Sequence, residues 1–297
     1  MAAVGQQSTG ISATPLGVRS TPGFTRRFVR QTGVPLAGTI ILLVVLAALF
    51  APLIAPYDPI DTAPRESLLS PSADHLLGTD QLGRDVFSRI VYGSRVSILV
   101  GIIAVGVAIV AGVPLGLISG YFGGLVDHAI MRAMDAIIAF PALVLALAIV
   151  GAVGPGTFQI MVAIGISSIP LYARLTRGQV LAIREQDYIE AARSLGMSNA
   201  RLLWRHVLPN SLSPLIVQAS LGVAFAILAE AGLSFLGVGV QPPSPTWGGM
   251  LSQALPLIER ASHLSIFPGL AIFITVLAIN MLGDALRDVL DPRLRGS

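Results

Sequence analysis

Few side chains in this sequence could carry out chemistry, and two of the usual kinds are absent. The 297 residues include no cysteine, and all 19 basic residues are arginine. Cysteine nucleophiles, thiolate zinc sites and Schiff-base chemistry are therefore excluded, as is a Walker A loop, which needs a lysine on the nucleotide phosphates. The four histidines show no HExxH or paired spacing, so no metal site is predicted. We expect no catalytic residue, no metal and no cofactor in this chain.

Two motifs of intramembrane proteases are also incomplete. Gly283-Asp284 lacks the preceding glycine of a GxGD motif, because Met281 stands at that position. Ser234 is followed by phenylalanine and not by the glycine that a rhomboid-like nucleophile would need. Proteolysis within the membrane is therefore not predicted.

Residues 174–210 predict two short helices joined by a sharp corner. An apolar stripe at i, i+4 and i+7 marks the first helix: Tyr188, Ala192 and Leu195. Gly196 can adopt the positive φ that ends a helix, and Ser198 is placed to cap the next one. The second helix has its apolar positions at Leu202, Leu203 and Val207. We expect Pro209 to end that helix, so that the loop forms a rigid knob on which a partner could dock.

Long runs without charged residues place the surrounding chain in a membrane. Hydrophobic residues make up 54% of the chain and charged residues 12%, about half the charged content of a soluble protein. Because about 20 apolar residues cross a bilayer core, we predict six spans, at 34–55, 96–120, 128–150, 157–174, 212–237 and 264–284. The glycines and proline at 151–156 divide the third span from the fourth.

The arginines orient these spans. With a cytoplasmic N-terminus, thirteen arginines fall on the inner side and five on the outer side, as the positive-inside rule requires. Both termini are then cytoplasmic, and residues 1–33 are expected to be a disordered tail. The formal charge of +3 is too small and too scattered to predict nucleic-acid binding.

The loop at 174–210 carries a spaced motif. Glu190-Ala191-Ala192 is followed after three residues by Gly196, after nine more by His206, and then by one residue and Leu208-Pro209. This pattern resembles the EAA loop of ATP-binding-cassette importer permeases, which has isoleucine in place of His206. The peptide-importer branch of that family often has histidine there.

Two further segments resemble the C-type dipeptide/oligopeptide permease subunits. One is the run 78–89, with Gly93, Arg95 and Ser97 following, and the other is 284–293. The similarity covers about residues 26–295. The nickel and glutathione importers share these motifs, so the motifs narrow the substrate without fixing it.

The resemblance implies an all-α polytopic membrane protein with six transmembrane helices and a type I importer permease fold in the bacterial inner membrane. An N-terminal helix and external loop at 34–94 would precede a permease core at 95–285 and a cytoplasmic tail at 286–297. The implied partners are a paralogous B-type permease, two ABC ATPase chains that bind ATP and Mg, an extracytoplasmic peptide-binding protein and the lipid bilayer. The residues implied to couple to the ATPases are Glu190, Ala191, Ala192, Arg193, Gly196 and Met197. An ATP-independent channel or carrier is the alternative from another class, and it leaves the EAA spacing unexplained.

Residues 79–90 predict an amphipathic helix in the outer interface. Thr79 reads as its N-cap and Asp80 as a favourable first-turn acid. Leu82, Val86 and Ile90 line one face at four-residue spacing. Asp85 stands four residues before Arg89, as in a helical ion pair. With Asp80 and Arg84, this helix either anchors the second span or contacts the binding protein.

Three charged residues fall within predicted spans and not at their end positions, and such residues mark candidate functional sites. Arg132 and Asp135 are three residues apart and either pair with each other or line the substrate path. Glu230 stands alone in the fifth span, where it either lines a cavity or hydrogen-bonds a neighbouring helix.

Overall fold

The computed structural model describes residues 28, 31 and 33–290, and no β-strand forms within that part of the chain. The predicted all-α class is confirmed. The predicted disorder of residues 1–33 falls, apart from three positions, outside the described residues. The helices longer than ten residues are α2 (Val34–Leu49), α4 (Val86–Phe122), α5 (Gly124–Ile138), α6 (Ala142–Val153), α7 (Thr157–Arg184), α10 (Leu208–Phe235) and α12 (His263–Leu290). The shorter ones are α3 (Ala51–Ile54), α8 (Asp187–Ser194), α9 (Asn199–Leu202) and α11 (Trp247–Ala254).

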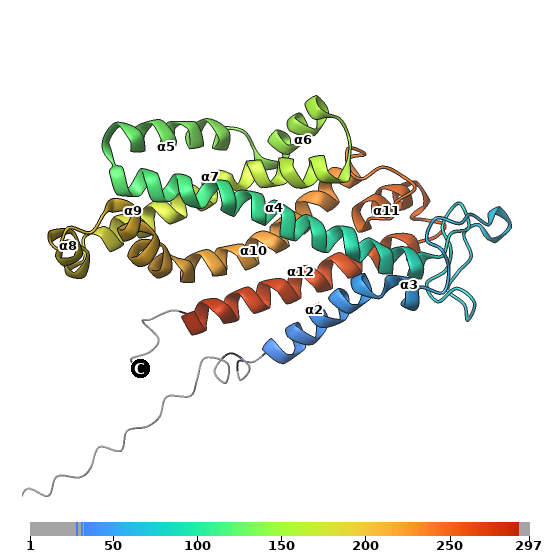
Figure 1. Cartoon of the computed structure of the whole chain (residues 1–297). Helices are drawn as coiled ribbons and strands as arrows, with labels where there is room; N and C mark the ends of the chain where they lie inside the picture. The colour runs from blue at the N-terminus through green and yellow to red at the C-terminus, as the bar shows by residue number, and fades with distance from the viewer. Residues whose placement is uncertain (1–27, 29–30, 32, 291–297) are drawn as a thin grey trace, which may run out of the picture.

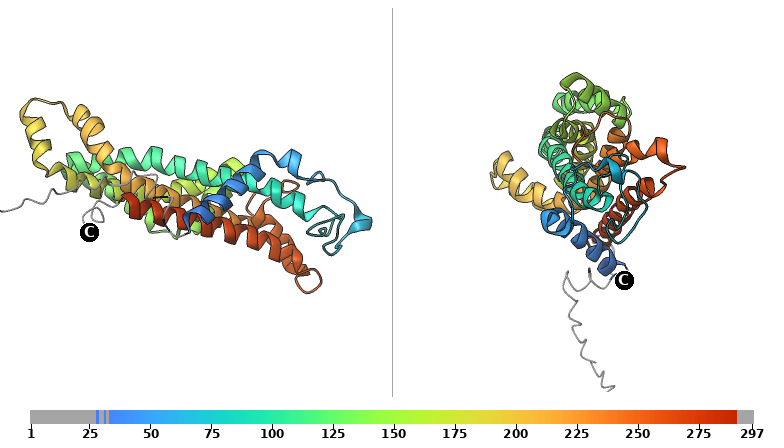
Figure 2. Two further views of the ribbon diagram at one scale, coloured as in Figure 1. Left: turned by 90° about the horizontal axis from the view of Figure 1, so that it is seen from below. Right: turned by 90° about the vertical axis from the view of Figure 1, so that its right-hand side faces the viewer.

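The four longest helices, α4, α7, α10 and α12, run side by side along one axis (Figure 1). α8 and α9 project from one end of this bundle, here called the α8 end, and residues 55–85 cover the opposite end, here called the loop end (Figures 1 and 2). The two ends are therefore separated by the full length of the bundle.

Helix length and composition support most of the predicted spans. Among the described residues, four helical segments are long and apolar enough to cross a membrane: Val86–Phe122, Thr157–Arg184, Asn199–Phe235 and His263–Leu290. A fifth candidate is the pair α5 and α6, and α2 is a shorter apolar helix of 16 residues. The prediction of six separate straight spans is thus confirmed only in part.

The third predicted span, 128–150, is not one helix. α5 and α6 meet at an angle of 87°, across a break at Ala139–Pro141. Pro141 has no N–H to continue the hydrogen bonding of α5, and its ring disfavours a helical conformation at Phe140. Pro141 was therefore a sequence signal for a helix break, but the uncharged residues around it were interpreted as part of one continuous span.

Close contact between α4 and α7 organises the centre of the bundle. Gly112, Gly116 and Gly120 recur at four-residue spacing on α4. A Cβ at Gly112 would lie 2.7 Å from the carbonyl oxygen of Ile169, and one at Gly116 would overlap the backbone of α7 at Ala173. Small residues at this spacing let helix backbones approach in a membrane, where no hydrophobic effect drives helices together.

Two predicted helix ends are wrong. Pro209 does not end the second loop helix, because it lies in the first turn of α10, where the missing N–H is tolerated. A π-turn at Leu203–Val207 joins α9 to α10, with the N–H of Leu208 bonding the carbonyl of Leu203. At the other end of the chain, α12 continues to Leu290, five residues into the segment predicted as a tail.

Candidate functional site

The corner between α8 and α9 is closed by a complete Schellman motif. Gly196 has φ of 79°, as its sequence position predicted. Its N–H donates to the carbonyl of Arg193 at 2.9 Å, and the N–H of Met197 donates to that of Ala192 at 3.2 Å. The segment 185–207, here called the elbow, is therefore a defined structure. Ser198 occupies the N-cap position of α9, although its side chain makes no capping hydrogen bond.

The elbow is held to the bundle by a face that the sequence stripe only partly identified. Ile189 is fully buried and Ala192 half-buried, in the same cluster as Leu202 and Val207. Tyr188 and Leu195, expected on the buried stripe, are 45% and 88% exposed. The i, i+3 spacing of Ile189 and Ala192 indicated the buried face in the sequence. The predicted stripe ran through Tyr188 and did not include Ile189.

Glu190, Ala191 and Arg193 are exposed residues of α8. The Glu190 side chain makes no hydrogen bond or ion pair with any described residue, so it does not cap the elbow. Beside it lies a hollow of about 380 Å³, and the Arg193 guanidinium sits 5.9 Å from the centre of the Tyr121 ring at the end of α4. The exposed side of α8 thus offers an unpaired carboxylate, a cation and a hollow to a docking partner.

His206, the departure from the EAA pattern, lies inside the elbow. Its ring is tilted against that of Tyr188 with centroids 6.4 Å apart. Asn210 connects the two residues, donating to the carbonyl oxygen of His206 at 2.6 Å and to the Tyr188 hydroxyl at 3.4 Å. The His206 side chain therefore packs between α8 and the start of α10.

The interfacial helix predicted at 79–90 is wrong. Residues 78–85 form a loop with a β-bridge between Thr79 and Asp85, and α4 begins at Val86. Asp85 is the N-cap and accepts a 2.7 Å hydrogen bond from the N–H of Ser88. The second span and its lead-in are one continuous helix, because nothing between Val86 and Val96 breaks it.

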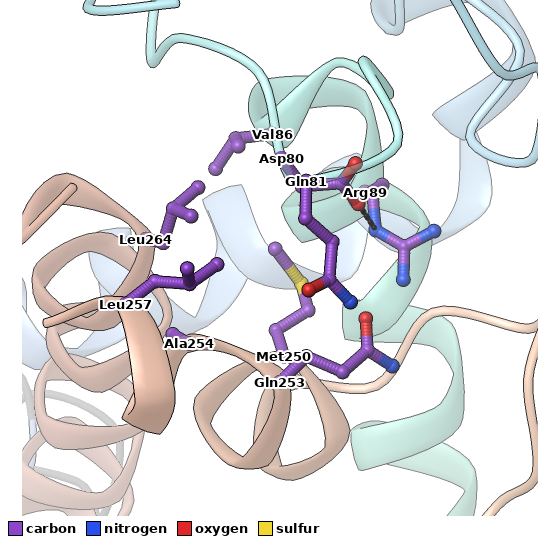
Figure 3. A pocket seen from close by; sticks show the side chains of 9 residues that line it. All are labelled: Asp80, Gln81, Val86, Arg89, Met250, Gln253, Ala254, Leu257 and Leu264. Atoms are coloured by element: carbon purple, nitrogen blue, oxygen red, sulfur yellow. Dashed lines mark ion pairs between the residues drawn. The ribbon is translucent and has the colours of Figure 1, made fainter. Parts of the chain in front are cut away.

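Asp80, Arg84 and Arg89 form a buried charge network at the loop end. Asp80 accepts from Arg84 Nε at 2.7 Å. It also lies 3.6 Å from Arg89 Nε, and Figure 3 marks this second ion pair. Arg89 also donates to the carbonyl of Pro59, so the predicted Asp85–Arg89 pair does not form. Arg84 reaches Gln253 of α11 at 3.1 Å. The adjoining cavity of about 20 Å³ has room for roughly one water, so the network holds structure and does not bind a solute.

His75 ties the same loop to the start of α4. Its Nδ1 lies 2.9 Å from Asp85 Oδ1, and its Nε2 lies 3.4 Å from Glu66 Oε2. Burial by itself lowers the pKa of His75, but the hydrogen bond and charge of Asp85, with a smaller contribution from Glu66, outweigh it and raise the pKa overall. The loop end thus carries a histidine whose protonated form is stabilised by folding.

The two aspartates of α5 pair with arginines of α7 and not with Arg132 of their own helix. Arg174 Nη2 lies 2.6 Å from Asp135 Oδ1, and Arg177 makes two hydrogen bonds of 2.6 Å to Asp127. The predicted Arg132–Asp135 pair is therefore wrong. Arg132 is exposed and has no partner among the described residues.

Glu230 is fully buried and lines none of the cavities described here, so of its two predicted alternatives the cavity-lining one finds no support. Ser234, one turn on in the same helix, donates to its Oε1 at 2.6 Å, while Oε2 has no hydrogen-bond partner within the described structure. In the described part of the chain, no group of three or more His, Asp or Glu side chains is arranged to hold a metal ion.

Two family profiles match the chain. Residues 112–296 match the family described as "Binding-protein-dependent transport system inner membrane component". Residues 23–71 match the "N-terminal TM domain of oligopeptide transport permease C".

Individual relatives and solved structures agree with these matches. A dipeptide transport system permease protein DppC of Alkalihalophilus pseudofirmus is 47% identical over 86% of this chain and 84% of its own length. A glutathione transport system permease protein GsiD of Pectobacterium atrosepticum is 46% identical over 92% and 91%. A di/tripeptide permease DppC of Pseudomonas aeruginosa is 48% identical over 86% of each chain. Among solved structures, an inward-facing MetNI methionine ABC transporter matches with a TM-score of 0.55 and 19% identity, over 68% of this chain and 96% of the other, which supports the fold alone.

Proposed function

The chain belongs to the family of binding-protein-dependent transport system inner membrane components, and we propose that it carries short peptides across the membrane. It is a membrane subunit of an ATP-binding-cassette importer. The named relatives handle dipeptides, di/tripeptides and glutathione, and these substrates share a short peptide backbone. Glutathione is the second candidate substrate, because relatives of that name match over nine-tenths of the chain.

The observation that carries the mechanism is the elbow. Its corner is locked by the Schellman motif, its inner face is buried against the bundle, and its outer face leaves Glu190 unpaired beside a hollow. A projecting, rigid element of this kind transmits a push from a docked motor to the helices that hold it. The chain has no lysine for a nucleotide-binding loop, so ATP and Mg would bind to two separate ATPase chains.

We assign Glu190, Ala191, Ala192, Arg193, Gly196 and Met197 to this coupling. Glu190 and Arg193 would form ion pairs with an ATPase groove, whereas Ala192 and Met197 hold the elbow closed. The α8 end would then be cytoplasmic, and the loop end would face the extracytoplasmic binding protein. A paralogous permease would complete the membrane part, and alternating access would move substrate between the two subunits.

The proposal is tested in a reconstituted complex of both permeases, the ATPases and a peptide-loaded binding protein. The variant Glu190→Ala should lower peptide uptake and ATPase association while inserting normally. The matched control is Glu259→Ala, because Glu259 is also an exposed glutamate but lies just before α12, outside the elbow. Equal uptake by Glu190→Ala, Glu259→Ala and the unmodified chain would contradict the coupling assignment. No stimulation of ATP hydrolysis by any peptide-loaded binding protein would contradict the substrate.

A further inference from the structure

One face of α7 is left partly uncovered by the described residues. Ser167, Leu171, Arg174 and Gly178 follow one another at i, i+4, i+7 and i+11, which places them on a single face of the helix. Leu171 is 49% exposed, and nothing lies within 4 Å of a Cβ built on Gly178. The opposite face of α7 is buried against the glycines of α4.

A cavity of about 370 Å³ lies beside this face at Ser167 and Leu171, between α4, α6, α7 and α10. Its polar wall includes Ser167, Ser168 and Gln218. Both serine hydroxyls donate to the carbonyl of Ile164 and keep their acceptor capacity. The side-chain amide of Gln218 makes no hydrogen bond with any described residue, although its backbone carbonyl accepts from the Tyr172 hydroxyl at 3.2 Å.

A second hollow, of about 510 Å³, continues along the same face toward the α8 end. The Arg174–Asp135 ion pair lies on its wall, with each side chain about half exposed. Arg132 adds an unpaired guanidinium. The bend at Phe140 and Pro141 separates the two hollows, since Ala142 lines the first and Asp135 lines the second.

The polar groups of the first cavity lie at membrane depth. Gly112 packs against Ile169 and Tyr172, and Gly222 packs against Tyr172 and Val105. These contacts place the cavity level with the middle of the charge-free stretch of α4. An amide without a hydrogen-bond partner at that depth would be costly against lipid, and so would a half-exposed ion pair one turn closer to the α8 end.

We propose that this face of α7 lines a water-filled path for peptide, open on the side that the second permease would close. The inference rests on the function proposed above and names the part of the chain that meets the substrate. Gln218, with both donor and acceptor groups, matches the amide groups of a peptide backbone. The Arg174–Asp135 pair presents both signs of charge, as the two termini of a free peptide require.

Because the chain has no cysteine, a single cysteine introduced on this path is the only thiol of the chain. Ser167→Cys and Leu171→Cys are placed in the complete complex in vesicles and exposed to a charged, membrane-impermeant methanethiosulfonate. The control is Val110→Cys, since Val110 is 75% exposed on α4 at a similar depth but belongs to an apolar groove. Thiols react as thiolates, which form in water and not in lipid. We expect Ser167→Cys and Leu171→Cys to react about tenfold faster or more than Val110→Cys.

Peptide uptake and stimulated ATP hydrolysis are measured on the same samples before labelling. If both are retained while the two path positions react no faster than Val110→Cys, the α7 face contacts lipid or protein, and the path is refuted although the importer function stands. If the unmodified complex does not import peptide, the proposed function itself fails.

A second variant tests the polar contact. Gln218→Leu should lower uptake of dialanine about fivefold, the effect of losing one hydrogen bond, while peptide-stimulated ATP hydrolysis persists. Leu212→Met, on the same helix but in the apolar groove away from this cavity, should leave uptake unchanged. Equal uptake by Gln218→Leu and the unmodified complex would overturn the role of Gln218.

Discussion

Replacing Gly196 by alanine should loosen the elbow without any steric clash. Nothing lies within 4 Å of a Cβ built at this position, so the φ of 79° is the only obstacle. An alanine in this left-handed conformation costs about 1–2 kcal/mol, which changes the equilibrium between the closed and open corner by about 5- to 30-fold. We expect the affinity for the ATPase chains to fall by up to that factor, because only the closed elbow presents the outer face of α8 correctly.

The assay is titration of the ATPase subunits onto vesicles that contain the permease pair, with uptake measured in parallel. Gly106→Ala is the matched control: it is a glycine of α4 in ordinary helical conformation with equally open surroundings, and alanine favours a helix there. Gly196→Asn should fall between the two, since asparagine tolerates positive φ better than alanine.

A clear result would refute this reasoning. If Gly196→Ala binds the ATPases as tightly as Gly106→Ala, the corner is not under conformational strain and the Schellman motif does not determine docking. If Gly196→Ala and Gly196→Asn lose affinity equally, the loss comes from a contact with the partner and not from the backbone conformation.

Three further outcomes follow from the packing and the loop end. Gly116→Leu should separate α4 from α7 and lower the thermal stability of the detergent-solubilised chain, whereas Gly106→Leu, which has open space around it, should leave that stability unchanged. Because folding raises the pKa of His75, its contribution is fully present below the unfolded pKa near 6.5 and is lost as the pH rises through the folded value. Limited proteolysis of residues 55–85 should therefore be slower at pH 6 than at pH 8, and His75→Gln should abolish that difference. Asp85→Ala should remove the cap of α4, worth about 1 kcal/mol, and leave His75 with an unpaired buried nitrogen for a further ~1–3 kcal/mol, so the same proteolysis should accelerate at both pH values.

The elements that depend on local signals were predictable from the sequence. Uncharged runs located the long helices, and the spacing from Glu190 to Gly196 located the corner with its positive φ. These signals succeed because span length and the left-handed conformation are set by the residues themselves and depend little on distant contacts.

The features that depend on tertiary contacts were not predictable in this way. The four-residue spacing of Asp85 and Arg89 predicted an ion pair. In the structure, Asp85 instead hydrogen-bonds His75, which lies in a loop, and Ser88, which lies at the start of α4. Asp135 pairs with Arg174, which is 39 residues away in sequence, because α5 and α7 lie side by side. Such partners become visible only once the helices are placed against each other.

Helix α4 has a mechanical consequence of its own. Its 37 residues extend about 55 Å, from the cap at Asp85 to Tyr121, whose hydroxyl holds Asn199 at 2.7 Å. A single strut therefore connects the two ends of the molecule, with Pro114 as the point where a backbone hydrogen bond is missing. A displacement of α9 is therefore transmitted along α4 to the loop end of the bundle. Any bending of α4 is concentrated at Pro114.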